Sequence, residues 1–156
     1  MQKPYIIDQS FLDALSAQAD AHPRKRKNYN FHATDGDAAH RLLNAMALDT
    51  YIIPHRHLAT DKDESIFIVR GKVGAVFFNE QGQVTDHSVL SPQGPGFGIN
   101  IPAGTFHTLV TLEAGSVFFE SKAGPYAPLT PAERAPWAPA EGEPAACDVE
   151  DPDCVV

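Results

Sequence analysis

Short hydrophobic runs separated by turn residues fill the middle of the chain, and this pattern predicts β-strands. From about Arg41 to Lys122 the runs are rich in Val, Ile, Phe and Thr, and breaks recur every eight to twelve positions. The expected strands are RLLNAMAL, TYIIPH, SIFIVRG, VGAVFFN, VTDHSVL, FGINIP, HTLVTL and SVFFESK. NEQGQ at 79–83 is typical of a hairpin turn. Eight short strands without intervening helices predict an all-β barrel or sandwich, although RLLNAM alone would also suit a helix.

The residues ahead of these strands predict one short helix and an irregular lead-in, together residues 1–37. Between Asp8 and Ala21 the apolar residues recur at helical spacing: Phe11, Leu12, Leu15 and Ala19. Ser10 is placed to cap this helix, and Pro23 lies just past its end. The next segment, RKRKNYNFHATDGDAAH, is polar, and we expect it to be irregular. The barrel itself is expected at 38–124.

Proline dominates the chain after Gly124, where seven of the 13 prolines lie. Such a stretch cannot form the interior of a sheet. We expect a docked, extended strap at 125–140, anchored by Tyr126 and Trp137, and a loose acidic tail at 141–156. Cys147 and Cys154 both lie in this tail, where two reduced thiols are expected and a disulfide between them is the alternative.

Composition and charge narrow the classes of function. A chain of 156 residues that is 43% hydrophobic suits one domain with a real core. No stretch reaches the roughly 18 apolar residues that cross a bilayer, and the start lacks a secretory pattern, so we expect a cytoplasmic protein without a membrane partner. Most of the formal charge of −8 comes from six acids beyond Arg134, and without them 14 acids face 12 bases. The basic run RKRK at 24–27 is typical of a solvated turn, so we expect no nucleic-acid partner.

The stretch IPHRHLATDKDE at 53–64 contains three candidate metal ligands. If TYIIPHRH is a strand, His55 and His57 point to the same side, because side chains alternate between the faces. Glu64 starts the next strand, and the loop between is long enough to bring the two strands side by side. Some forty residues later, IPAGTFHTLV places His107 near the start of another strand. One such histidine alone is more often a surface residue, whereas three imidazoles with one carboxylate suit one divalent ion such as iron, nickel, manganese, cobalt or zinc.

The two halves of this pattern resemble the two motifs of the cupin superfamily, which are small jelly-roll β-barrels. The first half is PHRH, six residues, glutamate, six residues and Gly71, and the second is GINIPAGTFH, with Pro102 and Gly104 in its turn. The resemblance implies four ligands: His55, His57, Glu64 and His107. It also implies that Gly71 and Gly104 are turn glycines.

One departure from the common cupin motif concerns the glutamate. Six residues separate His57 from Glu64, where the common form has three or four. Asp61 and Asp63 are therefore rivals to Glu64, which is favoured because it directly starts the strand and keeps the usual distance to Gly71.

Further segments resemble the WbuC-type cupin-fold metalloproteins. These segments are RLLNAM, TYIIPHRH, IPAGTFHTLV, SKAGPY and APWAPAEG, together with the N-terminal helix and NYNFH. The resemblance covers nearly everything from Tyr5 to Gly142 and implies a mononuclear metal site in a barrel. Because the reaction of that family is unsettled, the resemblance implies no substrate.

Side-chain parity along the strands predicts what else faces the ion. Tyr51 shares a face with His55, and the same rule adds Ile66 and Leu109 to the candidate pocket. For Tyr51, simple packing in the barrel is the alternative. Such a mostly apolar pocket is typical of a small-molecule site. Several other polar residues are interpreted as structural or surface residues: Asn30, His32, Arg41, His87 and Tyr126.

Two classes of function fit these expectations. The first is an enzyme in which the metal acts as Lewis acid or redox centre on a small oxygen-rich molecule, as a dioxygenase or as an isomerase or lyase. The alternative is a non-catalytic module that binds a small, sugar-like ligand through the metal, or a structural dimer. An apolar outer sheet face, with Phe67, Val69 and the FF pairs at 77–78 and 118–119, predicts a homodimer.

Overall fold

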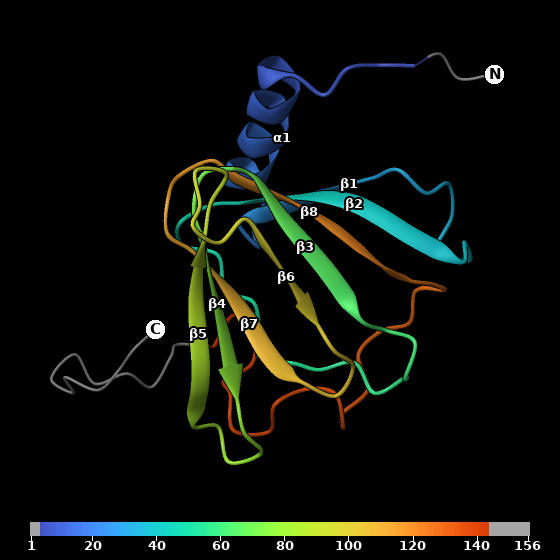
Figure 1. Ribbon diagram of the computed structural model, residues 1–156, viewed down its shortest axis with the longest axis vertical. Helices are drawn as coiled ribbons and strands as arrows, with labels where there is room; N and C mark the ends of the chain where they lie inside the picture. The colour runs from blue at the N-terminus through green and yellow to red at the C-terminus, as the bar shows by residue number, and fades with distance from the viewer. Residues whose placement is uncertain (1–3, 144–156) are drawn as a thin grey trace, which may run out of the picture.

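Two antiparallel sheets form the body of the protein in the computed structural model, which describes residues 4–143 (Figure 1). The larger sheet has the strand order β1-β2-β8-β3-β6, and the smaller one has the order β5-β4-β7. The helix and strands of the described residues are α1 (Gln9–Ala21), β1 (Arg26–Asn30), β2 (Ala39–Met46), β3 (Glu64–Arg70), β4 (Val73–Phe78), β5 (Val84–Leu90), β6 (Gly98–Ile101), β7 (Phe106–Thr111) and β8 (Ser116–Ala123). Within this range no helix is long and apolar enough to cross a membrane.

Seven of the eight expected strands are present, and RLLNAMAL is indeed a strand, β2. The turn at 79–83 joins β4 to β5 as the sequence predicts. The Asn79 N–H donates to the Gln83 carbonyl, and Gly82 takes the positive φ of +82° that favours glycine. Burial alternates along β3, whereas β5 is largely exposed and β7 is buried almost throughout.

The prediction of a strand at TYIIPH is wrong. The chain at 51–58 is irregular apart from isolated bridges of His55 with His107 and with Arg134. Pro54 has no N–H to give to a ladder, and the segment divides its hydrogen bonds between β7 on one side and the strap on the other.

The expectation of an irregular lead-in also needs correction, because Arg26–Asn30 forms β1 at one edge of the larger sheet. This strand pairs with β2 from Arg26↔Met46 to Asn30↔Leu42. Among its mostly polar residues, Tyr29 points toward α1, where its ring contacts the Phe11 ring edge-on with centroids 4.9 Å apart. The strand exists because α1 covers that face.

Helix α1 has the expected extent but a different cap. Asp8, not Ser10, is the N-cap, since its Oδ1 accepts the N–H of Phe11 at 3.0 Å and the hydroxyl of Ser10 at 2.8 Å. The helix buries Leu12, Leu15 and Ala19 in a cluster with Leu43, Ala45 and Val117 of the larger sheet.

Opposite faces of β2 and β8 separate this helix-side cluster from the core between the sheets. The inner core consists of Met46, Ile66, Ile68, Val73, Ala75, Leu90, Ile101, Leu109 and Phe118. Since side chains alternate along a strand, the neighbours of Met46 and Phe118 at two-residue spacing, Asn44 and Glu120, also face inward and line a cavity there.

Only part of the expected apolar outer face is exposed. Phe67 and Val69 on β3 are 55% and 40% exposed, because α1 packs against β1, β2 and β8. Phe118 is buried, Phe119 packs against the cluster beneath α1, and the Phe78 ring contacts Trp137 of the strap at a tilt of 49°.

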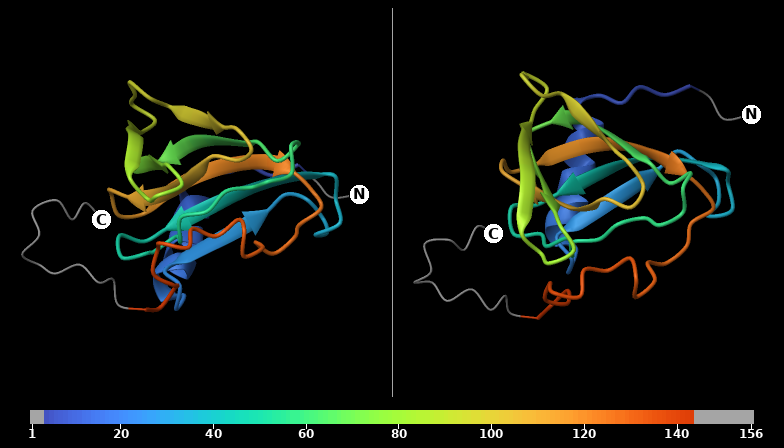
Figure 2. Two further views of the ribbon diagram at one scale, coloured as in Figure 1. Left: turned by 90° about the horizontal axis from the view of Figure 1, so that it is seen from below. Right: turned by 60° about the horizontal axis from the view of Figure 1, so that its bottom comes forward.

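In the right-hand view of Figure 2, the Pro-rich strap (orange-red) runs below both sheets. Trp137 contacts Phe78 and Phe106, with centroids 4.9 and 6.1 Å away. Tyr126 is not the expected anchor, since its side chain is 58% exposed and only its backbone N–H bonds to Asp35. The predictions for Cys147, Cys154 and most of the acidic tail lie outside residues 4–143.

Candidate metal centre

The backbone on either side of His55 is held by two neighbours. Its N–H and carbonyl exchange hydrogen bonds of 3.0 and 2.9 Å with those of His107 on β7. On the other side, the Ala135 N–H of the strap donates to the Pro54 carbonyl at 3.0 Å. This double attachment places the His55 ring centroid 4.6 Å from that of His107.

His57 is fixed by the turn that precedes β7 and by the strap. The Gly104 N–H donates to the His57 carbonyl at 2.7 Å, and Gly104 has a φ of +84°. The next residue, Leu58, donates its N–H to Glu133 Oε1 at 3.0 Å. A glycine is needed in the turn because an L side chain rarely adopts this backbone conformation.

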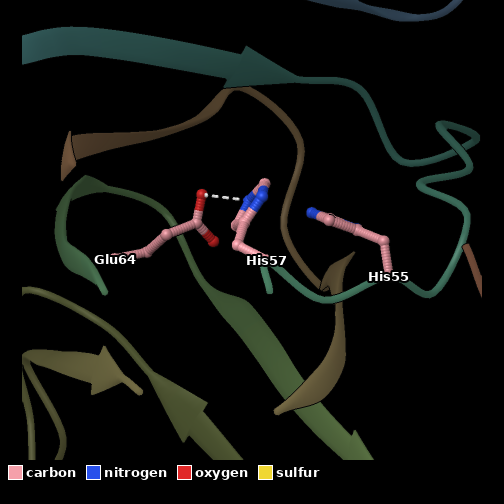
Figure 3. A group of neighbouring side chains, drawn as sticks. All are labelled: His55, His57 and Glu64. Atoms are coloured by element: carbon pink, nitrogen blue, oxygen red, sulfur yellow. Dashed lines mark hydrogen bonds and ion pairs between the residues drawn. The ribbon is translucent and has the colours of Figure 1, made fainter. Parts of the chain in front are cut away.

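Glu64 brings the histidines together at the start of β3. Its carboxylate is 4% exposed and lies with Oε1 3.1 Å from His57 Nε2 and with Oε2 3.0 Å from His107 Nε2. Figure 3 shows His55 and His57 turned toward this carboxylate, and one ligand atom from each of the three residues lies within 4.8 Å of the others.

The two rival carboxylates lie elsewhere. Asp63 is exposed, and its Oδ1 accepts the Ala103 N–H at 2.9 Å. Asp61 is exposed in the same loop. The six residues between His57 and Glu64 thus form an exposed loop with a turn at 59–61, and Glu64 after them is buried.

Hydrogen bonds to backbone carbonyls determine which ring nitrogen carries the proton in His55 and His107. His55 Nδ1 lies 3.0 Å from the Ile53 carbonyl, and His107 Nδ1 lies 2.9 Å from the Thr105 carbonyl. Because a carbonyl only accepts, both Nδ1 atoms carry a proton, and the Nε2 atoms of the neutral rings keep their lone pairs. This is the arrangement that metal-ligating histidines adopt.

The spacing of these atoms fits one cation. His107 Nε2 lies 3.0 Å from Glu64 Oε2, and either a proton on Nε2 or a cation held by both atoms satisfies this contact. Two ligands held about 2.1 Å from one ion at a right angle lie ~3 Å apart. The contacts of Glu64 with His57 and His107 have this length. The donor set and its spacing therefore fit a divalent transition metal.

The electrostatics favour the ligand forms of these side chains. Burial would raise the pKa of the Glu64 carboxyl, but hydrogen bonds from His107 and His57 and the charge of Lys122 hold it well below its usual range. Burial and the neighbouring His107 lower the pKa of His55 to about 4. At neutral pH the carboxylate is thus ionised, and the His55 imidazole is neutral.

A cavity of about 130 Å³ adjoins His55, Glu64 and His107. Its apolar lining consists of Met46, Ile52, Ile66, Leu109 and Phe118. Two expected pocket residues, Ile66 and Leu109, are thus at the cavity, whereas Tyr51 is not among its lining residues. The Tyr51 hydroxyl donates to the Pro139 carbonyl at 2.9 Å, because the segment is not a strand and the parity argument fails there.

The polar lining is the part of the site that sequence reasoning missed: Arg26, Asn44, Glu120 and Lys122. Lys122 Nζ lies 2.7 Å from Glu64 Oε1 and 2.7 Å from Glu120 Oε1. The available signal was the two-residue spacing of Phe118, Glu120 and Lys122, which puts all three on one face of β8.

Burial and neighbouring charges shift the pKa values of Glu120 and Lys122 in opposite directions. Burial raises the pKa of Glu120, although Lys122 partly offsets this effect. Burial would lower the pKa of Lys122, but the carboxylates of Glu120 and Glu64 raise it above its usual value. Lys122 therefore remains a cation at the cavity wall.

The other polar residues singled out in the sequence lie away from the cavity. Asn30, Arg41, His87 and Tyr126 are exposed. His32 is buried and stacks on His40, with ring centroids 4.0 Å apart.

Comparisons with known proteins add the family and the fold. The model of a family described as a domain of unknown function (DUF6016) matches residues 7–90. No curated protein matches the chain at a significant level.

Several solved structures are similar in fold. KdgF from Halomonas sp. is 19% identical, with a TM-score of 0.51 over 67% of this chain and 83% of that chain. A conserved protein of unknown function from Streptococcus pyogenes is 13% identical, with a TM-score of 0.53 over 81% of this chain and 93% of that one. A cupin superfamily protein from Desulfitobacterium hafniense is 13% identical, with a TM-score of 0.52 over 70% of this chain and 86% of that one. The cupin-like β-fold expected from the sequence is confirmed.

Proposed function

The chain belongs to the DUF6016 family, a domain of unknown function, and we propose its function from its site. We propose that it is a mononuclear divalent-metal protein that acts on or binds a small oxygen-rich molecule. One observation carries this proposal: the Glu64 carboxylate lies 3.1 and 3.0 Å from the Nε2 atoms of His57 and His107, beside a cavity. His55 completes the proposed ligand set. A bound divalent ion supplies Lewis acidity or redox chemistry at this place.

Elemental analysis tests the metal centre. Protein purified without a histidine tag should contain about one ion of iron, nickel, manganese, cobalt or zinc per chain. His57→Ala should lose the ion, whereas the control His87→Ala, on the exposed face of β5, should keep it. Full retention of metal by His57→Ala would contradict the proposed centre.

For an enzyme, we propose a dioxygenase or an isomerase or lyase, and the identity of the metal separates these branches. Iron together with dioxygen uptake in the presence of small thiols, diketones or phenols would support the dioxygenase. Turnover without dioxygen, on nickel, manganese or zinc, would support an isomerase or lyase acting on a sugar-like or dicarbonyl compound.

A second candidate is a binding module without turnover, and the pairing of the cavity's polar side chains favours it. Glu120 contacts Lys122 and accepts the Asn44 amide at 2.8 Å, so these groups already hold each other. Stable binding of a sugar-like ligand without product formation, followed by mass spectrometry, would support this candidate over the enzyme.

We also propose that the chain is of the WbuC type. The segments that carry this resemblance are those that build the site: IPAGTFHTLV contains His107, SKAGPY contains Lys122, and APWAPAEG forms the strap around Trp137. A variant in which a Gly-Ser linker of equal length replaces APWAPAEG tests the proposed role of the strap. Loss of metal from this variant would support the role, and full retention of metal would contradict it.

The remaining proposals concern assembly and location. We propose a homodimer through the exposed face of β3, where Phe67 is 55% exposed. We also propose a cytoplasmic location, which fractionation of the source cells with an antibody against the chain would test.

A further inference from the structure

A lysine stands beside the candidate ligands on the inner face of the barrel. Lys122 of β8 is the register partner of Glu64 on β3. Its Nζ lies 2.7 Å from Glu64 Oε1 and 2.7 Å from Glu120 Oε1, and its side chain is 23% exposed and lines the cavity. An ammonium group has three N–H donors, and its hydrogen bond to Glu64 and its ion pair with Glu120 leave at least one for a ligand.

The groups around Lys122 are held in place before any ligand arrives. Glu120 is only 8% exposed, and its Oε2 accepts the Asn44 amide at 2.8 Å. Asn44 lies on β2 and is the register partner of Phe118 on β8. Since these side chains project from paired strands, the ammonium is fixed at the cavity wall.

The charges that line the cavity do not balance once a divalent cation joins Glu64. Arg26 shares the Glu141 carboxylate of the strap with Arg24, with Arg26 Nη2 3.0 Å from Glu141 Oε2, so these three groups add no negative charge to the cavity. The charges left over are the cation, Lys122, Glu64 and Glu120. Two carboxylates cannot neutralise a divalent ion and an ammonium, so at least one positive charge remains in a largely buried place.

The rest of the cavity limits the ligand to a small molecule with little additional polarity. Most of the wall consists of aliphatic and aromatic side chains, and the volume is about 130 Å³. A carboxylate carries one negative charge, whereas a phosphate carries about −1.5 to −2 and more oxygens to satisfy. The charge balance and the lining therefore favour a small carboxylate.

We propose that Lys122 binds the carboxylate of a small acid held in this cavity, so that the metal-loaded protein selects such acids over their neutral analogues. The inference rests on the proposed metal centre and names the substrate class of that same site. Lys122 would thus be a specificity-determining residue.

Calorimetry with a matched pair of probes tests this inference. Zinc-saturated protein is titrated with lactate and with lactamide, which differ in the charge of one group. Lactate should bind at least about tenfold more tightly, because a charged partner in a desolvated site is worth more than a neutral one. Equal affinities, or no binding of lactate, would overturn the inference.

Variants of the lysine separate charge from packing. Lys122→Met should reduce the affinity for lactate to that for lactamide, and Lys122→Arg should restore the preference. The control Lys27→Met, on β1 and outside the cavity lining, should leave both affinities unchanged. A preserved preference in Lys122→Met, checked for folding by circular dichroism in zinc, would contradict the role of Lys122.

The zinc content of each sample distinguishes the two proposals. A wild-type chain that takes up no metal contradicts the proposed function itself. A chain that takes up one ion but does not discriminate between the probes contradicts only the role of Lys122.

Discussion

Lys122 and Glu64 face each other across β8 and β3, with the ammonium 2.7 Å from the carboxylate. The same ammonium lies 2.7 Å from Glu120, so one cation compensates two carboxylates that are 4% and 8% exposed. In this way the chain stabilises the acidic residues at its centre without a metal ion. A bound divalent ion would take over part of this compensation.

Lys122→Met should therefore destabilise the metal-free protein by about 3 kcal/mol, because removing one partner leaves buried charge unpaired. Saturating zinc should recover part of this loss, since the ion supplies positive charge at Glu64. Urea unfolding with and without zinc measures both effects. An unchanged midpoint in the metal-free protein would show that the ammonium is dispensable.

Glu133 links the strap to the segment that carries His57, and its removal should weaken metal binding. Its Oε1 accepts the Leu58 N–H, and its Oε2 accepts the N–H and hydroxyl of Thr130. Glu133→Ala should lower zinc affinity about tenfold, the usual effect of losing a group that positions a ligand. Competition with a chelating dye measures this, and Glu113→Ala, at an exposed position in the β7–β8 turn, is the control.

The same carboxylate should make stability depend on pH in a defined range. The N–H groups of Thr130 and Leu58 lower the pKa of Glu133 to about 2 from an ordinary 4.5. Because the pKa is lowered on folding, the contribution is fully present above pH 4.5 and is lost as the pH falls through 2. The stability difference between wild type and Glu133→Ala should shrink over this range in acid unfolding, and a constant difference would contradict the assignment.

The sequence predicted strands from runs of Val, Ile, Phe and Thr between turn residues, both where burial alternates, as in β3, and where it does not, as in β5 and β7. It missed β1 because Asn28 and Asn30 mask the aromatic face of Tyr29, which only the contact with α1 explains. It overpredicted TYIIPH because nothing local reveals that Pro54 lies between β7 and the strap.

The candidate ligands were accessible from sequence, whereas the opposite wall of the cavity was not. Histidines next to apolar strands are distinctive in type and spacing, and the structure brings His57, Glu64 and His107 together. Glu120 and Lys122 share the two-residue spacing of Phe118, but the pairing of β8 with β3, which puts Lys122 beside Glu64, depends on residues far apart in the chain. Their role at the cavity follows from strand register.

Gly104→Ala should destabilise the turn that holds His57 by about 1–2 kcal/mol, the cost of a left-handed conformation for an alanine. Gly104 has a φ of +84°, and a Cβ there would meet no atom within 4 Å, so the cost comes from the backbone alone. Gly36→Ala is a suitable control because that glycine is also uncrowded but lacks a positive φ. Thermal unfolding of both variants checks the difference, and equal midpoints would contradict it.

The exposed side chains of β3 should control the oligomeric state. Phe67 is 55% exposed and Val69 is 40% exposed on the part of the larger sheet that α1 leaves open. Phe67→Glu should convert the proposed dimer to a monomer, because it places a charge in an apolar contact. Light scattering measures the mass, and Val84→Glu, at a 51% exposed position on β5, should leave it unchanged. A wild-type chain that stays monomeric at high concentration would exclude the dimer, and Phe67 would then be a solvent-facing residue.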